Sequence, residues 1–250
     1  MRVLFTICGR AGSKGIKNKN IRKFLGAPLP LYTLSAIELY LKQNEDIEGD
    51  VAVNTDSKEL VEILKKSGML PIEFVKRKEG LGGDLVPKIQ VIQDTYVELK
   101  KRKEREYDMV VDLDITSPLR TVADIRNLIK KKEETECDIV FSVAPSRRNP
   151  YFNMVKKTEH GYKKVIESNF VARQQAPEIF DMNASMYAYK PEFLMSGQGV
   201  LDGHSEVIHM YDTGVLDLDH EGDFELMEVI ADYLFKNKRE FGEIADNIVI

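Results

Sequence analysis

Short apolar segments that alternate with segments of helical periodicity constrain the fold of this chain more than any other feature. The apolar segments cover residues 2–8, 50–54, 109–113 and 138–143. Runs of this length are typical of strands that are buried on both faces. Between them, apolar residues recur at three- and four-residue steps, and Thr121 and Asp124 have the spacing of a capping box that begins one helix. The alternation predicts an α/β fold in which helices cover both faces of a mostly parallel sheet.

The pattern changes after residue 143, where a basic loop with two prolines precedes a polar stretch at 153–176. That stretch has little helical periodicity, and a strand-like pattern returns at 184–189. A last amphipathic helix is expected near the C-terminus. We therefore predict a single domain over residues 1–250, in which residues 145–190 leave the sheet as a subunit-contact arm.

The composition excludes several classes of protein. The 250 residues include 36 basic and 41 acidic side chains, a net charge of −5, which argues against a general nucleic-acid binder. The longest uncharged stretch, residues 24–37, contains a glycine and two prolines and is too short to span a membrane. The two cysteines have no CxxC spacing. We expect a cytoplasmic protein in a reducing compartment, with neither nucleic acid nor a membrane as a partner.

The loop after the first predicted strand, residues 9–20, has the sequence GRAGSKGIKNKN. Its glycines would allow backbone N–H groups to approach an anion, and its lysines and arginine would neutralise one. Because parallel sheets bind ligands at the carboxyl ends of their strands, the expected ligand is a di- or triphosphate. Neither GxxxxGK[ST] nor GxGxxG is present, and a basic turn held by glycines is the alternative.

The spacing Arg10-x-Gly12-Ser13-Lys14-Gly15-Ile16-x-x-Lys19-Asn20 resembles the signature loop of the acylneuraminate cytidylyltransferases, also called CMP-sialic acid synthetases. Later segments follow the order of that family: Thr55-Asp56, Thr116-Ser117-Pro118-Leu119-Arg120, Arg173-Gln174, Pro177, Asn183, Tyr187 and Asp217-Leu218-Asp219. The resemblance implies a three-layer, Rossmann-like nucleotidyltransferase sandwich. It also implies a homodimer that joins CTP to a nonulosonic acid, giving a CMP-sugar and pyrophosphate, with an arm that contributes to subunit contact and sugar binding.

The resemblance also implies roles for individual residues. Arg10, Lys19 and Asn20 would hold the triphosphate and stabilise charge on the departing pyrophosphate. The full set of nucleotide-binding residues implied is Arg10, Gly12, Ser13, Lys14, Lys19, Asn20 and Arg77. For Arg77, a surface arginine beside Lys76 and Lys78 is the alternative.

Transfer from a nucleoside triphosphate needs a divalent cation, and Mg²⁺ prefers oxygen ligands. Asp217 and Asp219 stand two residues apart and would share one face of an extended segment, so both could bind one Mg²⁺. Asp219 would also orient or deprotonate the attacking hydroxyl. A solvent-facing acidic pair is the alternative, and the four histidines have no spacing that favours zinc.

The family resemblance implies that the sugar substrate is bound by five residues: Asp114, Arg173, Gln174, Asn183 and Tyr187. The Arg173 guanidinium suits the sugar carboxylate and would reach it across a dimer interface. Tyr187 lines the sugar pocket or belongs to the core. Common family members have glutamine where this chain has Asp114, and a carboxylate only accepts hydrogen bonds. We infer a legionaminic-type sugar, although Asp114 could instead join Asp112 as a metal ligand.

Two other functions fit the same fold. One is a nucleotidyltransferase with 3-deoxy-octulosonate or a sugar 1-phosphate as acceptor, and the other is a noncatalytic nucleotide-binding protein. Both nucleotidyltransferase functions require that the basic loop, residues 9–20, and the acidic pair Asp217 and Asp219 lie in one cleft. Lys19 and Asp219 are therefore expected to be neighbours in the folded chain.

Overall fold

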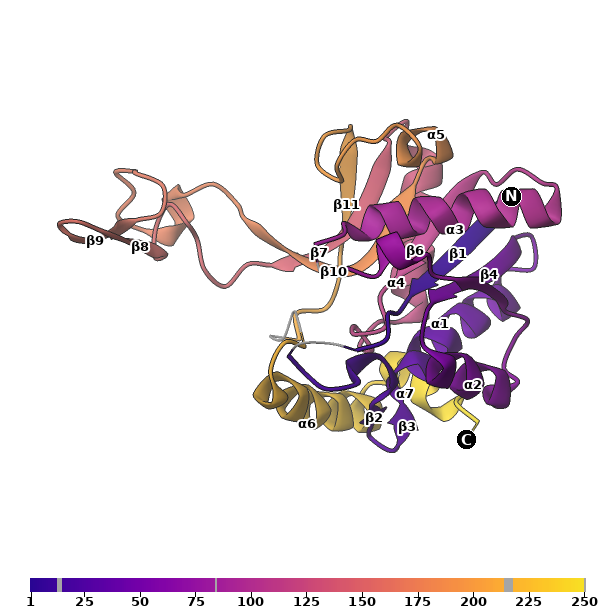
Figure 1. Ribbon diagram of the computed structural model, residues 1–250. Helices are drawn as coiled ribbons and strands as arrows, with labels where there is room; N and C mark the ends of the chain where they lie inside the picture. Colours follow the sequence, from indigo (N-terminus) through magenta and orange to yellow (C-terminus); the bar gives the residue numbers. More distant parts are fainter. Residues whose placement is uncertain (13–14, 84, 214–217, 250) are drawn as a thin grey trace.

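A seven-stranded sheet forms the centre of the structure (Figure 1). The computed structural model describes residues 1–12, 15–83, 85–213 and 218–249. In the order in which they lie across the sheet, the strands are β11 (Ser205–His209), β7 (Ile139–Pro145), β10 (Phe180–Tyr189), β6 (Met109–Leu113), β1 (Arg2–Cys8), β4 (Glu48–Thr55) and β5 (Glu73–Lys76).

The sheet is mostly parallel, as the alternating pattern predicts. β1 pairs in parallel with β4 and β6, β4 with β5, and β7 with β11. β10 runs antiparallel to both of its neighbours, β6 and β7. The four predicted strands are present, and β5 and β11, at the two edges, were not predicted.

Both faces of the sheet are covered, which gives three layers. β1 shows why: Phe5 and Ile7 pack into one hydrophobic cluster, whereas Leu4 packs into the other. The first cluster includes side chains of α1 (Leu29–Gln43), α2 (Lys58–Ser67), α4 (Val122–Glu134), α6 (Glu221–Asn237) and α7 (Arg239–Asp246). The second includes side chains of α3 (Lys88–Lys103) and α5 (Pro191–Leu194). Burial on both faces explains the nearly continuous apolar run at the start of the sequence.

The capping box predicted for Thr121 and Asp124 is confirmed at the beginning of α4. The Thr121 hydroxyl accepts a hydrogen bond from the Asp124 backbone N–H at 3.1 Å, and the Asp124 carboxylate accepts one from the Thr121 N–H at 2.8 Å. These bonds satisfy N–H groups that a helix start would leave unpaired. Among the helices in the described ranges, none has the length and apolar character needed to cross a bilayer.

One segment leaves the body of the protein as an arm (Figure 1). It comprises residues 146–179, and its tip carries the hairpin of β8 (Val155–Thr158) and β9 (Gly161–Lys164). The predicted excursion, residues 145–190, extends too far, because β10 lies in the sheet between β7 and β6. The strand-like pattern expected at 184–189 is confirmed as the second half of β10, whereas the polar residues of its first half and the irregular pairing with β7 were not recognised as strand.

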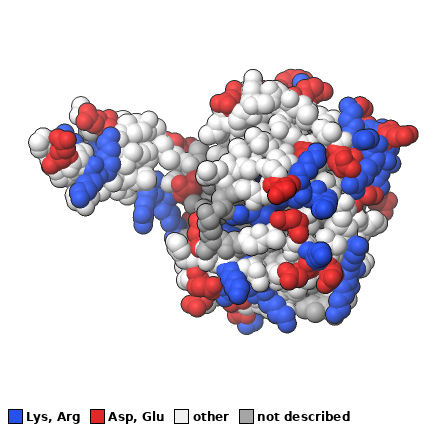
Figure 2. All heavy atoms as spheres, in the orientation of Figure 1, with Lys and Arg blue, Asp and Glu red and all other residues white. Residues whose placement is uncertain are grey.

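Charged side chains of both signs are interspersed over the face of the molecule in Figure 2. This view agrees with the nearly balanced count of 36 basic and 41 acidic residues. The cationic loop that the sequence singles out is therefore a local concentration of positive charge in a chain of mixed charge.

Candidate active site

A pocket of about 370 Å³ lies at the carboxyl ends of the central strands. Its lining residues are Cys8, Arg10, Gly15, Lys19, Asn20, Arg77, Leu81, Gly83, Val86, Lys88, Val91, Asp114, Thr116 and Asp219. β1 ends at Cys8 and β6 ends just before Asp114, so strand ends form the base of the pocket. This is the edge at which an open parallel sheet binds ligands.

Hydrogen bonds between side chains and backbone groups of the basic loop hold this loop over the strand ends. The Ala11 N–H donates to the Asp56 carboxylate at 2.6 Å, and the Asn20 amide donates to the Arg10 carbonyl at 3.0 Å. Gly12 has a φ of +70°, a left-handed conformation that glycine adopts without strain. Asn20 thus fixes the shape of the loop that carries Arg10. Two predicted nucleotide-binding residues of this loop, Ser13 and Lys14, lie outside the described residues.

The basic loop meets the segment before α6 at the mouth of the pocket. Lys19 begins the short helix η1 (Lys19–Ile21), and its ammonium lies 3.7 Å from Asp219 Oδ1. The same ammonium donates to the Leu218 carbonyl at 2.7 Å. A Cβ added to Gly15 would lie 2.1 Å from the Asp219 carbonyl oxygen, so the two backbones touch. The expectation that Lys19 and Asp219 are neighbours is confirmed.

Asp219 is oriented by the first turn of α6. The Asp223 carboxylate accepts hydrogen bonds from the N–H groups of Asp219 and His220, at 3.2 and 2.8 Å. The Asp219 side chain itself is 69% exposed and lines the pocket. A carboxylate in this position fits Mg²⁺, which keeps several waters and phosphate oxygens as ligands. Within the described ranges no three His, Cys, Asp or Glu residues cluster as a metal site, and Asp217 lies outside those ranges.

Arg77 is buried in the wall of the pocket and is not a surface arginine. It follows β5 and is only 8% exposed. Its guanidinium donates to the side-chain oxygen and to the carbonyl oxygen of Asn54, both at 3.1 Å. Burial lowers the pKa of Arg77. Asn54 therefore fixes a buried cation beside the basic loop, consistent with the predicted place of Arg77 near the nucleotide.

The sequence analysis missed a buried ion-pair cluster at the base of the pocket. The Lys88 ammonium lies 2.7 Å from Asp112 Oδ2 and 2.6 Å from Asp114 Oδ2. Asp112 is fully buried, and its other oxygen accepts a hydrogen bond from the Thr6 hydroxyl at 2.8 Å. The ammonium stands between the two carboxylates, where the alternative prediction would place a metal ion.

The ion pair between Lys88 and Asp114 favours the charged form of both side chains. Burial by itself would lower the pKa of Lys88, but Asp112 and Asp114 outweigh burial and raise that pKa well above its usual range. Burial would likewise raise the pKa of Asp114, but Lys88 and two hydrogen bonds from Thr116 hold it below its usual range. Arg120, 1% exposed, donates to the Asp114 carbonyl. Two cations thus balance two carboxylates.

A sequence signal for this cluster exists. Asp112 and Asp114 interrupt and follow the apolar run of β6, and a carboxylate in a buried strand requires a partner. The partner is 24 or more residues away in the chain, and a lysine at the beginning of a helix has the appearance of a solvated side chain. The sequence therefore shows that a cation is needed without showing which one.

The other predicted sugar-binding residues lie outside this pocket in the single chain. Arg173 and Gln174 belong to the short helix η3 (Arg173–Gln175) of the arm, where Arg173 donates to the Ser146 carbonyl. Asn183 accepts a hydrogen bond from the Ser142 hydroxyl at 2.6 Å. Tyr187 lies opposite Asp112 in the pairing of β10 with β6, with its ring stacked on that of Tyr189. Their roles remain predictions.

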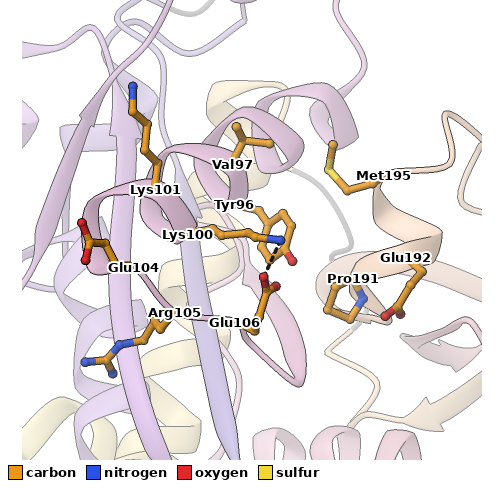
Figure 3. A pocket seen from close by; sticks show the side chains of 10 residues that line it. All are labelled: Tyr96, Val97, Lys100, Lys101, Glu104, Arg105, Glu106, Pro191, Glu192 and Met195. Atoms are coloured by element: carbon orange, nitrogen blue, oxygen red, sulfur yellow. Dashed lines mark ion pairs between the residues drawn. The ribbon is translucent and has the colours of Figure 1, made fainter.

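A larger cavity, about 760 Å³, lies at the other end of α3 and is shown in Figure 3. Its charged side chains are of both signs, and Lys100 pairs with Glu106 at 2.6 Å. None of the predicted site residues lines it. Size alone therefore does not identify the active site, whereas the convergence of cations and a carboxylate at strand ends does.

A mostly parallel sheet between two layers of helices, with a basic glycine loop after its first strand facing an exposed carboxylate, has the features of a nucleotidyltransferase that binds its ligand at the strand ends. The family described as Cytidylyltransferase matches residues 4–215. A post-translational flagellin modification protein B from Campylobacter coli is 34% identical over 237 residues, which cover 94% of this chain and 96% of that protein. The chain belongs to the cytidylyltransferase family, so the resemblance noted in the sequence is confirmed.

Two further comparisons agree. A CMP-N,N'-diacetyllegionaminic acid synthase from Campylobacter jejuni is 33% identical over 239 residues, 96% of this chain and 99% of that protein. A structure of CMP:2-keto-3-deoxy-manno-octonic acid synthetase complexed with CTP has a TM-score of 0.63. The two chains are 13% identical in sequence, and the superposition covers 93% of this chain and 99% of the other. The structural similarity supports the predicted fold.

Proposed function

We propose that this enzyme transfers the cytidylyl group of CTP to a nonulosonic acid. The observation that carries the proposal is the approach of the Lys19 ammonium to within 3.7 Å of Asp219, in a pocket that also contains Arg10 and Asn20. The anomeric hydroxyl oxygen forms a bond to the α-phosphorus of CTP, and the bond from that phosphorus to the bridging oxygen breaks. The products are a CMP-sugar and pyrophosphate.

The cations of the pocket bind the triphosphate. Arg10 and Lys19 donate N–H groups to phosphate oxygens and stabilise the charge that accumulates on the pyrophosphate. Asn20 keeps the Arg10 backbone in place through its 3.0 Å hydrogen bond. Gly12, Ser13 and Lys14 complete the proposed nucleotide-binding loop, and Arg77 lines the wall beside it.

Asp219 and Asp217 are proposed to hold Mg²⁺. The bound ion would offset charge on the triphosphate and on the leaving pyrophosphate. The Asp219 carboxylate orients the anomeric hydroxyl and accepts its proton. The exposed position of this carboxylate, opposite the basic loop, supports the assignment.

The sugar is proposed to be of the legionaminic type. The presence of Asp114 in the pocket supports this substrate, as does the 33% identity to a protein named CMP-N,N'-diacetyllegionaminic acid synthase. Arg173, Gln174, Asn183 and Tyr187 are proposed to complete the sugar site. Since Arg173 lies on the arm, it would act on a partner subunit.

The proposed role of Arg173 requires a homodimer, which we propose as the assembly. Three apolar side chains of the arm are strongly exposed, namely Val155, Tyr162 and Val171, at 61%, 72% and 82%. Burial of these side chains against a partner subunit would remove apolar surface from water, which favours association. Sedimentation velocity of the purified chain tests the assignment, and a monomer at micromolar concentration would contradict it.

The function is tested by measuring pyrophosphate release from CTP and Mg²⁺ with N,N'-diacetyllegionaminic acid, N-acetylneuraminic acid and 3-deoxy-octulosonate. We expect the highest kcat/KM with the legionaminic sugar. Preference for N-acetylneuraminic acid would remove the assignment of the sugar. Preference for 3-deoxy-octulosonate would move the enzyme to another acceptor, and tight CTP binding without turnover would indicate a noncatalytic protein.

Asp219→Asn is expected to raise the Mg²⁺ concentration needed for half-maximal activity by at least about 10-fold, because the variant loses an anionic metal ligand. The measurement is a Mg²⁺ titration of pyrophosphate release at saturating CTP. Glu225→Gln removes an exposed carboxylate of α6, the helix that follows Asp219, and serves as the control. Equal Mg²⁺ requirements for Asp219→Asn and the control would contradict the metal assignment.

A further inference from the structure

The cluster at the base of the pocket leaves one donor and one acceptor available to a ligand. The Lys88 ammonium has three N–H donors, and two carboxylates receive at most two of them. Asp114 Oδ1 accepts two hydrogen bonds, from the N–H and the hydroxyl of Thr116. Asp114 Oδ2 has two lone pairs, and Lys88 uses one. The remaining donor and acceptor therefore lie side by side.

Both groups face the pocket, and both are held in place. Lys88 and Asp114 line the pocket, with side chains 31% and 23% exposed. Lys88 begins α3 directly after Pro87, and the fully buried Asp112 anchors its ammonium from behind. Thr116 fixes the Asp114 carboxylate from the other side. A donor and an acceptor that are preorganised in this way bind a complementary group at a low entropic cost.

The charge of the cluster indicates which part of the substrates it recognises. By formal charge, the cations Lys88 and Arg120 equal in number the two carboxylates Asp112 and Asp114, so these four side chains together are neutral. A neutral cluster offers no net attraction to a triphosphate, in contrast to Arg10 and Lys19. It suits a neutral group that both donates and accepts a hydrogen bond, such as a hydroxyl.

We propose that Lys88 and Asp114 together determine sugar specificity, with the Lys88 ammonium donating to, and the Asp114 carboxylate accepting from, a hydroxyl or acylamino substituent of the nonulosonic acid. The inference rests on the proposed function. It also explains the departure at Asp114: the glutamine of common family members offers a donor and an acceptor in one amide, and here two side chains supply them. Lys88 is then a specificity residue that acts with Asp114 and does not act on the phosphates.

The test uses a variant that keeps the buried charges balanced. Lys88→Met alone would leave Asp112 buried without its cation, which can prevent folding. The double variant Lys88→Met/Asp112→Asn removes both charges. We expect kcat/KM for the sugar to fall about 30-fold, the value for one lost charge-assisted hydrogen bond, with the KM for CTP changed less than about threefold.

Adding Asp114→Gln to that double variant restores a donor and an acceptor in one amide. We expect this triple variant to recover about 10-fold in kcat/KM and to shift its preference toward N-acetylneuraminic acid. A purely structural role for the cluster would give no such recovery. Lys100→Met, at the other end of α3, removes a lysine whose partner Glu106 is exposed and is the matched control.

Each outcome decides the inference. A rise in the KM for CTP or a loss of discrimination against UTP would place the cluster at the nucleotide and overturn it, as would unchanged sugar kinetics in a folded double variant. If the double variant does not fold by circular dichroism, Asp114→Asn decides in its place: unchanged sugar specificity overturns the inference. If the wild-type enzyme shows no activity with any nonulosonic acid, the proposed function is refuted, and the inference fails with it.

Discussion

Lys19→Met is expected to lower kcat about 10³-fold, the largest effect of any single substitution considered for this enzyme. The variant loses the cation that we propose binds the phosphates and also the 2.7 Å hydrogen bond that ties the basic loop to the Leu218 carbonyl. Methionine retains the length of the side chain, so the η1 helix should persist. The measurement is pyrophosphate release at saturating CTP and sugar, with a single-turnover experiment to separate the chemical step from product release.

Lys17→Met is the matched control. Lys17 belongs to the same loop and is exposed, and it is not among the described residues that line the pocket. We expect its kcat to stay within about threefold of the wild type, since an isolated surface charge is screened by solvent and salt. Equal losses in the two variants would mean that the total charge of the loop matters and that the position of Lys19 does not.

Gly15→Ala is expected to lower kcat/KM by roughly 10²-fold without unfolding the protein. The added methyl group would lie 2.1 Å from the Asp219 carbonyl oxygen, and backbone cannot yield as a flexible side chain does. The loop and the segment before α6 must then move apart by about 1 Å, which is enough to misalign a reaction by that factor. Kinetics and thermal unfolding, measured together, separate misalignment from loss of stability.

Gly222→Ala provides the comparison for this effect. Gly222 lies in the first turn of α6, close in sequence to Asp219, and an added Cβ there meets no heavy atom within 4 Å. Alanine also favours the helix, so we expect unchanged activity and equal or greater stability. Wild-type kinetics for Gly15→Ala would show that the contact between Gly15 and Asp219 is not needed for catalysis.

The sheet is predictable from the sequence where strands are buried on both faces and less so elsewhere. β1 and β6 are mostly apolar and buried, and the sequence predicts both at their observed positions. β5 and β11 lie at the sheet edges, are short and contain partly exposed residues, so their patterns resemble loops. β10 is central but carries polar residues and a register shift. The sequence analysis expects one amphipathic helix near the C-terminus, and the structure has two there, α6 and α7.

The residues of the candidate site likewise fall into those that a local sequence pattern predicts and those that it does not. Residues close together in the sequence, such as Arg10, Lys19 and Asn20, form a recognisable local pattern, and the structure brings them into one pocket. Lys88 has no local pattern, because its role depends on the approach of α3 to the end of β6. Arg173 was predicted from the family pattern alone, and a single chain places it on the arm. Contacts between helices and strands that are distant in the sequence cannot be predicted from local sequence patterns, and neither can contacts between subunits.

The arm leaves and re-enters the sheet at one point, because Pro145 at the end of β7 is paired with Phe180 at the beginning of β10. Two adjacent antiparallel strands need only a tight turn to connect them. The body of the enzyme therefore places no demand on the length of residues 146–179. Insertions or deletions in this segment can therefore be accommodated while the register between β7 and β10 stays intact, so the arm can change in length and sequence independently of the sheet.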